Sequence, residues 1–234
     1  MLPRVLEPEV MDTPEEALAY DAMDHSEVNR VFVDDILRTY AEGGCQRRAS
    51  QRELDVPAGE WLDLGTGTAL IPIELCERVP DVRVVAMDLS LAMLDVARAN
   101  ISVAGLTERI MLVHDDAKRL PFSDGKFAAV ISNSIVHHIP DPSGVLAEAW
   151  RVLAPGGLVF FRDLLRPGDD ETVRRLVGAY AAGATEHQRR MFDDSLRAAL
   201  TLDEVRALIK PLGVDPESVS QSSDRHWTWA AWKE

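Results

Sequence analysis

The stretch Glu60-Trp-Leu-Asp-Leu-Gly-Thr-Gly-Thr-Ala-Leu-Ile-Pro-Ile-Glu-Leu75 decides the fold of this 234-residue chain. Its first apolar residues predict a short buried strand, and the apolar spacing after the glycines predicts an amphipathic helix. Gly65 and Gly67 stand between the two, where the chain reverses sharply and where a Cβ would keep a ligand away from the backbone. Pro72 falls early in the expected helix, where it displaces no intrahelical hydrogen bond. The stretch therefore predicts a strand, a ligand-binding glycine turn and a helix.

The residue before the turn narrows the choice of ligand. A glycine turn that opens a helix cradles nucleotides in more than one group of enzymes, so it identifies no single ligand. Asp63 stands at the end of the expected strand, two residues before Gly65. An acid at that place is less typical of dinucleotide binding than of a ligand with an amino-acid end. The segment Gly65-Thr-Gly-Thr-Ala69 also lacks the third glycine of the dinucleotide pattern.

Further stretches follow in order along the chain: Asp63 to Ala69, Val84 to Ser90, Asp115 to Phe122, and Ile131 to Ile139 with Arg151 to Gly157 after it. Together they resemble the motifs of class I S-adenosylmethionine (SAM)-dependent methyltransferases. The first is similar to motif I of that family, the second to its second strand with the ribose-binding acid, and the third to its adenine-binding segment. The resemblance covers roughly residues 55 to 165. It is nearest to the subgroup of ubiquinone and menaquinone C-methyltransferases and many small-molecule methyltransferases.

The resemblance implies SAM as the cofactor, with S-adenosyl-L-homocysteine as its product. Asp63 and the glycine turn would hold the methionine end, Asp88 the ribose hydroxyls, and Asp116 the adenine. Asp88 also stands at the C-terminal end of a strand, where open parallel sheets bind ligands. The alternative role of Asp88 would be to cap the next helix, but Ser90 can serve as that cap. Met93 has the alternative of filling the core. The implied cofactor-binding residues are Asp63, Gly65, Thr66, Gly67, Asp88, Leu89, Met93, Asp116, Ala117, Asn133 and Ser134.

Two adjacent histidines after the expected fourth strand are the candidates for catalysis. His137 or His138 could take a proton from an acceptor, since imidazole titrates near neutral pH. In the family subgroup a histidine at this place is common without being a base, so a structural role stays open. Adjacent side chains point in different directions, and we expect at most one of the two to face the pocket. We expect no metal, because neither a cysteine nor a second histidine cluster accompanies the pair.

Residues 1–54 are expected to form an N-terminal helical cap, followed by the methyltransferase domain at 55–234. The first 14 residues predict an extended arm, and Thr13-Pro-Glu-Glu16 predicts the start of a helix. The apolar spacing then continues with one interruption, and Gly43-Gly44 is expected to end the unit before a linker at 46–57. Two interpretations stay open: a helix packed on the main domain, or a lid that brings Tyr20 and His25 to the substrate.

Three more candidates for substrate binding come from the second half of the chain. Asp163 and Arg166 follow the expected fifth strand, where they could bind a polar substrate group or, equally well, form an internal ion pair. Two helices predicted at 170–182 and 185–200 form an insertion, residues 169–200, before the sheet is completed. Tyr180 lies in this insertion, and helices added at strand ends often carry substrate contacts.

The motifs and the periodicity together predict an α/β fold, a Rossmann-like, mostly parallel sheet of seven strands with helices on both faces. Residues 127–132 form a nearly continuous apolar run, as in a parallel strand buried on both faces. The helical cap precedes the sheet, and the helical insertion precedes strand six. Segments 218–222 and 226–232 predict an antiparallel C-terminal hairpin, with Trp227 and Trp229 on one packed face.

Composition excludes several classes of protein. The formal net charge of −14 argues against duplex nucleic acid, whose binding depends on neutralising phosphates. No apolar run approaches the roughly 18 residues of a membrane span, and the first residues lack the apolar core of a signal peptide. Cys45 and Cys76 lack metal or redox spacing, which fits a reducing cytosol. We therefore expect a cytoplasmic protein with a small-molecule substrate and no membrane partner, either a monomer or a homodimer.

The expected reaction is transfer of the SAM methyl group to an O, N, S or C atom of a small-molecule acceptor by in-line displacement. Such a reaction needs positioning and exclusion of water more than a catalytic triad. The segment Asn133-Ser-Ile-Val136 lacks the Asn/Asp-Pro-Pro-aromatic motif that acts on the exocyclic amines of bases. Two other functions stay open: a catalytically silent SAM-binding scaffold and, less in keeping with the glycine pattern, an NAD(P)-dependent oxidoreductase.

Overall fold

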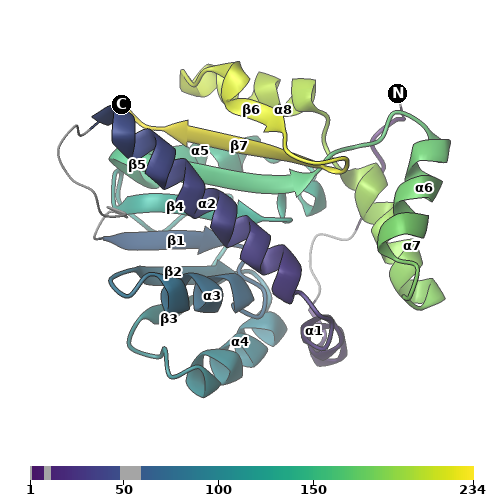
Figure 1. Cartoon of the computed structure of the whole chain (residues 1–234), viewed down its shortest axis with the longest axis horizontal. Helices are drawn as coiled ribbons and strands as arrows, with labels where there is room; N and C mark the ends of the chain where they lie inside the picture. The colour runs from purple at the N-terminus through teal and green to yellow at the C-terminus, as the bar shows by residue number, and fades with distance from the viewer. Residues whose placement is uncertain (1, 8–11, 48–58) are drawn as a thin grey trace.

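The computed structural model describes residues 2–7, 12–47 and 59–234, and these form a seven-stranded sheet in the order β3-β2-β1-β4-β5-β7-β6 (Figure 1). Five strands run parallel: β1 (Glu60–Leu64), β2 (Arg83–Asp88), β3 (Ile110–His114), β4 (Phe127–Asn133) and β5 (Leu153–Leu164). Antiparallel pairing joins β5 to β7 (His226–Trp232) and β7 to β6 (Val219–Gln221). The predicted mostly parallel sheet with an antiparallel C-terminal hairpin is confirmed.

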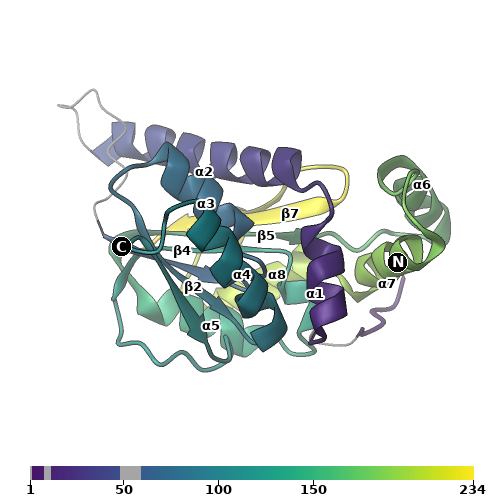
Figure 2. The same cartoon turned by 90° about the horizontal axis from the view of Figure 1, so that it is seen from below.

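Helices cover both faces of the sheet and enclose two apolar cores (Figure 2). One face carries α2 (Ser26–Arg47), α3 (Leu70–Arg78) and α4 (Leu91–Val103). The other face carries α5 (Ser143–Val152) and α8 (Leu202–Ile209), followed by the 3-10 turns η2 (Lys210–Leu212) and η3 (Pro216–Ser218). Neighbouring residues of β1 enter opposite cores, Trp61 on the α2 side and Leu62 on the α5 side, which is why parallel strands need continuous apolar runs. Trp227 and Trp229 are both fully buried on the α5 side, as their alternation predicts.

The long helix α2 is part of the packing of the sheet. Its residues Phe32 and Ile36 are fully buried in the core on that face. The prediction that Gly43-Gly44 ends the unit is wrong, because α2 continues to Arg47. Gly43 has another reason to lack a side chain: a Cβ there would lie 2.7 Å from the indole of Trp232. The predicted linker beyond residue 47 and the boundary between residues 54 and 55 lie outside the described residues.

Two N-terminal segments lie near the C-terminal ends of the parallel strands. α1 (Pro14–Asp21) begins with the capping box of Thr13 and Glu16 and packs beside α4. Residues 2–7 have no regular secondary structure, and the N–H of Val5 donates to the carbonyl of Arg197, 3.1 Å away, at the end of α7 (Glu186–Ala198). The described part of the N-terminal arm therefore lies against the helical insertion.

The predicted insertion forms α6 (Asp170–Tyr180) and α7, which stand at one end of the molecule beyond the sheet (Figure 1). They share a small apolar core with the end of β5, made of Leu164, Val173, Leu176, Leu196 and Ala199. None of the helices in the part of the chain that the structure describes is long and apolar enough to cross a membrane.

Candidate active site

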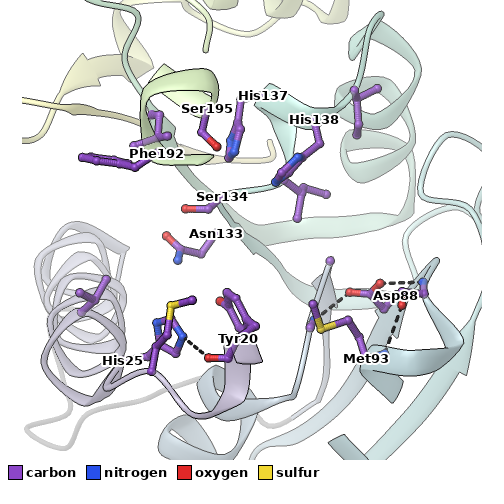
Figure 3. Close-up of a pocket in the computed structure, with 18 of the residues that line it drawn as sticks. Tyr20, His25, Asp88, Met93, Asn133, Ser134, His137, His138, Phe192 and Ser195 are labelled. Atoms are coloured by element: carbon purple, nitrogen blue, oxygen red, sulfur yellow. Dashed lines mark hydrogen bonds between the residues drawn. The ribbon is translucent and has the colours of Figure 1, made fainter. Parts of the chain in front are cut away.

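A cavity of about 760 Å³ lies at the C-terminal ends of the parallel strands, between α1 on one side and α6 and α7 on the other (Figure 3). Most of the predicted site residues line it: Tyr20, His25, Gly65, Gly67, Asp88, Leu89, Met93, Asp116, Ala117, Asn133, Ser134, His137, His138 and Tyr180. Four predicted residues lie outside the lining: Asp63, Thr66, Asp163 and Arg166. The structure thus brings together around one cavity residues that lie more than 150 positions apart in the sequence.

The glycine turn needs both of its glycines, for two different reasons. Gly65 and Gly67 have φ angles of +71° and +55°, in the left-handed region that favours glycine. A Cβ on Gly65 would overlap the side chain of Ile135, whereas a Cβ on Gly67 would meet only the ring of Tyr20, at 3.8 Å. The N–H groups of Gly65 and Thr66 both donate to the carbonyl of Met87 at 2.9 Å, which ties the turn to the end of β2. Gly65 is therefore required by packing, and Gly67 by its turn conformation and its place on the cavity wall.

Asp88 connects this turn to the start of α4. Its Oδ2 accepts the N–H of Gly67 at 2.8 Å, and its Oδ1 accepts the N–H of Ser90 at 2.9 Å. Burial raises the pKa of this carboxyl, although the backbone N–H donors of Ser90 and Gly67 act in the opposite direction. The cap of α4 is Ser90, whose Oγ accepts the N–H of Met93 at 3.1 Å. The Asp88 carboxylate is thus held at the cavity wall with lone pairs to spare.

Asp63 lies beneath the turn and has an unusual environment. It is 2% exposed, and its Oδ2 has no hydrogen-bond partner among the described residues. Burial, and secondarily the charge of Asp88, raises the pKa of Asp63 to about 7, while the neighbouring Thr66 hydroxyl acts in the opposite direction. A buried acceptor without a partner is costly unless a ligand satisfies it. The ammonium group of SAM, which the motifs imply as cofactor, would satisfy it, so the residues at this end of the cavity fit that cofactor.

The predicted adenine-binding residues form the neighbouring wall. Asp116 Oδ1 accepts the N–H of Lys118 at 2.9 Å and lies 3.3 Å from its Nζ. Met93 is 6% exposed and still contributes to the cavity lining. It therefore combines the core role and the lining role that the sequence left open.

Tyr20 and His25 close the cavity from the side of α1. Their rings stack with centroids 4.4 Å apart, and His25 Nε2 lies 2.9 Å from the carbonyl oxygen of Tyr20. Both line the cavity, and Tyr20 lies against Gly67. The predicted N-terminal cap therefore contributes to the cavity through α1, the turn that follows it and the first residues of α2, while the rest of α2 packs on the sheet.

Asn133 and Ser134 lie at the end of β4, between the predicted cofactor residues and the histidine pair (Figure 3). Ser134 has φ of +63°, which is uncommon for a residue other than glycine, and its N–H donates to the carbonyl of Arg162 at 2.9 Å. Backbone held in this region costs free energy and is concentrated at functional sites.

The histidines lie side by side in the 3-10 turn η1 (Val136–His138), with ring centroids 4.0 Å apart. His137 Nδ1 lies 2.5 Å from Asp163 Oδ1. Glu7 Oε1 lies 3.4 Å from His137 Nε2 and 3.0 Å from His138 Nδ1. The prediction that at most one ring faces the cavity is wrong, because both line it, held by carboxylates that the local sequence does not reveal. In the sequence we looked only for a cysteine or a second histidine cluster beside the pair, and the structure adds a carboxylate, Glu7, that we did not consider there.

Electrostatics at the pair follow from these contacts. Burial by itself would lower the pKa of His137, but the Asp163 carboxylate and Glu7 outweigh it and raise the pKa above its ordinary value. Burial likewise works against ionisation of Asp163, yet His137 and the N–H of Leu164 hold the pKa of Asp163 below its ordinary range. The two groups therefore form a buried charge-assisted hydrogen bond.

Asp163 and Arg166 do not occupy the place predicted for substrate contacts. Asp163 is 1% exposed and is engaged by His137. Arg166 is buried, with Nη2 donating to Glu204 at 2.6 Å and Nη1 to the carbonyl of Ala199 at 3.0 Å. Both residues are paired inside the protein, which is the alternative that the sequence left open. Asp163 pairs with His137 and Arg166 with Glu204, rather than with each other. Buried charges need such partners, which leaves neither residue available to a substrate.

Tyr180 keeps its predicted place on the cavity wall. Its hydroxyl lies 3.0 Å from both carboxylate oxygens of Asp224, and the guanidinium of Arg225 lies 3.4 Å from its ring centre. The ring is half exposed and is held at the mouth of the cavity by these contacts.

The N-terminal arm contributes contacts near the histidine pair that sequence reasoning missed. Arg4 donates to the carbonyls of Ala198, Pro140 and Ile139 at 2.7, 2.8 and 2.9 Å, and it also reaches the carbonyl of His137 at 3.2 Å. Glu7 Oε2 accepts the hydroxyl of Ser195 on α7 at 3.1 Å. The residues joined by these contacts are more than 130 positions apart in the sequence, so no local sequence pattern predicts them.

Comparison with known proteins agrees with this arrangement. Residues 62–161 match the family described as a methyltransferase domain. The chain is 31% identical over 183 residues to 27-O-demethylrifamycin SV methyltransferase of Amycolatopsis mediterranei, an alignment covering 76% of this chain and 63% of the relative. It is 36% identical over 165 residues to a demethylmenaquinone methyltransferase of Roseiflexus castenholzii, covering 66% of this chain and 67% of the relative. Across the curated relatives compared, the matched part of the relative ranges from 44% to 67%.

The fold is shared more widely than the sequence. A SAM dependent methyltransferase from Aquifex aeolicus has a crystal structure that matches 94% of this chain and 97% of its own, with a TM-score of 0.60 at 15% identity. The sequence matches and the shared fold agree with the residues gathered around the glycine turn, and this chain belongs to the class I SAM-dependent methyltransferases.

Proposed function

We propose that this protein transfers the methyl group of SAM to a hydroxyl oxygen of a small-molecule acceptor with an apolar body. The observation that carries the proposal is one continuous cavity that has the family's cofactor residues at one end and the histidine pair at the other. Methyl transfer requires the two substrates to meet in line inside a space that excludes water. A cavity of about 760 Å³ has the size expected of such a site.

The cofactor end is proposed to act by positioning. Asp88 binds the ribose hydroxyls, Asp116 and the backbone of Ala117 bind the adenine, and Asp63 pairs with the ammonium of the methionine end. The glycine turn lets the backbone approach the cofactor closely. SAM supplies an activated methyl group, so the chain needs no group of its own to activate the donor.

The acceptor end is proposed to bind an apolar ring or chain. Apolar and aromatic side chains from α2, β5, α6 and α7 and from the residue that follows η1 line it: Val28, Leu164, Tyr180, Phe192 and Ile139. Such a surface holds an apolar body by burial and leaves orientation to a few polar groups. The relative from Amycolatopsis mediterranei is named as a 27-O-demethylrifamycin SV methyltransferase, which supports an oxygen as the acceptor atom.

His137 and His138 are proposed to act on the acceptor. A hydroxyl is a poor nucleophile until it loses its proton, whereas a thiolate or an enolate needs less help. An imidazole can assist in two ways, by accepting the proton itself or by binding a cation that holds the acceptor oxygen. The carboxylates of Glu7 and Asp163 beside the pair support either route.

Calorimetric titration with SAM, S-adenosylhomocysteine and NADH tests the cofactor assignment. We expect both sulfur compounds to bind and NADH not to bind. Asp88→Ala should weaken SAM binding by about tenfold or more, which is the loss of roughly 1.4 kcal/mol. Asp95→Ala is the matched control, since Asp95 is an exposed carboxylate on α4, the helix that follows Asp88, and is paired with Arg98. Equal SAM affinity in the Asp88 and Asp95 variants would remove the ribose assignment, and binding of NADH alone would overturn the function.

Incubation with methyl-labelled SAM and a panel of apolar compounds, each with and without a free hydroxyl, tests the acceptor class. We expect label to pass to the hydroxyl-bearing members and not to their methyl ethers. Transfer to both members of a pair would show that carbon or another atom is methylated instead. Cofactor binding without transfer to any acceptor would favour the silent scaffold.

A further inference from the structure

Three side chains at the acceptor end bring lone pairs to one point. Glu7 Oε1, His137 Nε2 and His138 Nδ1 all lie within 4.8 Å of one another. Glu7 comes from the N-terminal arm, and the histidines come from η1, so only the folded chain assembles the group. Both histidines also line the cavity in which the acceptor is proposed to bind (Figure 3).

The separations of the Glu7 oxygen from the two imidazole nitrogens are those of ligands around one ion. Metal–nitrogen and metal–oxygen bonds of about 2.0–2.2 Å, at angles between octahedral and tetrahedral, place neighbouring ligand atoms about 3.0–3.5 Å apart. The Glu7 oxygen lies 3.0 Å from His138 Nδ1 and 3.4 Å from His137 Nε2. These atoms are buried, and Glu7 Oε1 and His138 Nδ1 have no hydrogen-bond partner among the described residues despite their short separation. Their contact is a close approach of charges that lacks the geometry of a hydrogen bond, as expected of two ligand atoms that face a shared third atom.

Outer partners fix two of the three side chains. Asp163 Oδ1 contacts His137 Nδ1 at 2.5 Å, which directs Nε2 of the same ring to Glu7 and the cavity. A carboxylate on the far nitrogen of a histidine is the usual support of a metal-binding imidazole. Ser195 donates to Glu7 Oε2 at 3.1 Å, which orients Oε1 in the same way.

The charges around the cluster suit a cation. Glu7 and Asp163 bring two carboxylates to a pair of imidazoles. Arg4 is close to the cluster, but its guanidinium donates to the carbonyls of Ala198, Pro140 and Ile139 rather than to either carboxylate. Two nitrogen donors and one oxygen donor favour a divalent transition metal over Mg²⁺ or Ca²⁺, which prefer oxygen alone.

We propose that Glu7, His137 and His138 bind one divalent transition-metal ion of the Zn²⁺ class, with an open coordination position toward the acceptor. This inference rests on the proposed function, and it gives the histidine pair its role: ligands rather than bases. The acceptor hydroxyl binds at the open position, where the ion makes its proton easier to lose to solvent. Its oxygen then forms a bond to the methyl carbon while the carbon–sulfur bond of SAM breaks. The bonding electron pair stays on sulfur, which leaves S-adenosylhomocysteine neutral at that atom.

Metal analysis of the full-length protein tests the site without any acceptor. The protein is freed of metal with a chelator. One sample is titrated with Zn²⁺ by calorimetry, and a second sample is titrated with Co²⁺ by visible absorption, which reports the ligand geometry. We expect a 1:1 complex and Co²⁺ bands of a mixed nitrogen–oxygen site. Glu7→Gln and His138→Asn should each weaken Zn²⁺ binding by well over tenfold, and Asp163→Asn by about 10–100-fold through His137.

His187→Asn is the matched control, because it removes an exposed imidazole of α7 that lies outside the cavity lining. SAM affinity is measured on every variant and should stay unchanged in all of them, which shows that each one is folded and keeps the cofactor end intact. Absence of stoichiometric Zn²⁺ binding in the wild type would overturn the site, as would equal binding by the Glu7 and His187 variants. Loss of SAM binding in the wild type would instead defeat the proposed function.

Discussion

The two ends of the cavity are built in different ways. The cofactor end comes from loops that follow successive parallel strands, so its residues fall in short segments, 63–67, 88–93 and 115–117. The acceptor end is assembled from the N-terminal arm, η1, the end of β5 and the insertion helices α6 and α7. The first is held by backbone geometry and the second by side-chain contacts between distant segments. We therefore expect substitutions at the cofactor end to change both stability and SAM binding. Substitutions at the acceptor end should change stability or metal binding and leave SAM binding almost unaltered.

The largest effect is expected at the glycine turn. Gly65→Ala forces a left-handed φ of +71° on a residue with a side chain and drives a Cβ into Ile135. The strain costs about 1–2 kcal/mol and the overpacking about 1–3 kcal/mol, so the free energy of unfolding should fall by about 2–5 kcal/mol in urea titration.

Gly168→Ala is the control for that variant, because nothing lies within 4 Å of a Cβ there and its φ is not in the left-handed region. It should stay within about 0.5 kcal/mol of the wild type. Adding Ile135→Ala to Gly65→Ala should recover the part of the loss that overpacking causes. A Gly65→Ala variant as stable as the control would show that the turn is not what fixes this end.

A second substitution separates stability from binding at the same end. The pKa of Asp63 is raised from 3.8 to about 7, so the folded state binds the proton more tightly than the unfolded state. Stability without SAM should then fall as pH rises from about 4 to about 7 and stay low above that. Asp63→Asn removes this loss, so it should raise the melting temperature at pH 8 by more than at pH 5. The corresponding gain in the free energy of unfolding is at most a few kcal/mol.

The same variant should bind SAM more weakly by about tenfold or more, because it loses the charge that pairs with the ammonium group. Wild-type affinity for SAM should also increase as pH rises through 7, as Asp63 ionises. Melting curves at both pH values, with and without SAM, measure the two effects together. A variant that is destabilised at pH 8 without SAM would contradict the account of Asp63 as an unpartnered buried acid.

The smallest effect is expected in the N-terminal arm. Arg4→Met keeps the aliphatic stem but removes hydrogen bonds to Ala198, Pro140 and Ile139. The loss should be about 1–3 kcal/mol of unfolding free energy, and Zn²⁺ affinity should fall because Glu7 is no longer held beside the histidines. SAM affinity should change by less than about twofold, since the arm is not part of the cofactor end.

Arg38→Met is the control, because Arg38 is an exposed residue of α2 paired with Asp35. It should affect neither Zn²⁺ nor SAM binding. If Arg4→Met weakened SAM binding as much as Zn²⁺ binding, the two ends of the cavity would not be independent.

The accuracy of the sequence-based expectations follows the same division. Pattern and spacing located the strands, the glycine turn and Asp88, because each depends on neighbours within a few positions. Gly43-Gly44 misled because a glycine can serve either a helix end or close packing, and only the approach of Trp232 distinguishes the two. For Asp163 and Arg166 the sequence left two interpretations open, because a charged residue at a strand end can face either the site or the interior.

The sequence by itself determined the doubly covered parallel sheet and the cofactor, and it named most of the residues that line the proposed cofactor end of the cavity, since periodicity and turn chemistry are local properties of the chain. Only the tertiary structure decided the acceptor end. There the arm returns across more than 130 positions to place Glu7 against His138, and β5 places Asp163 against His137. Contacts of this kind depend on how separate elements pack, and no residue carries a local signal for a partner that folding brings from so far away.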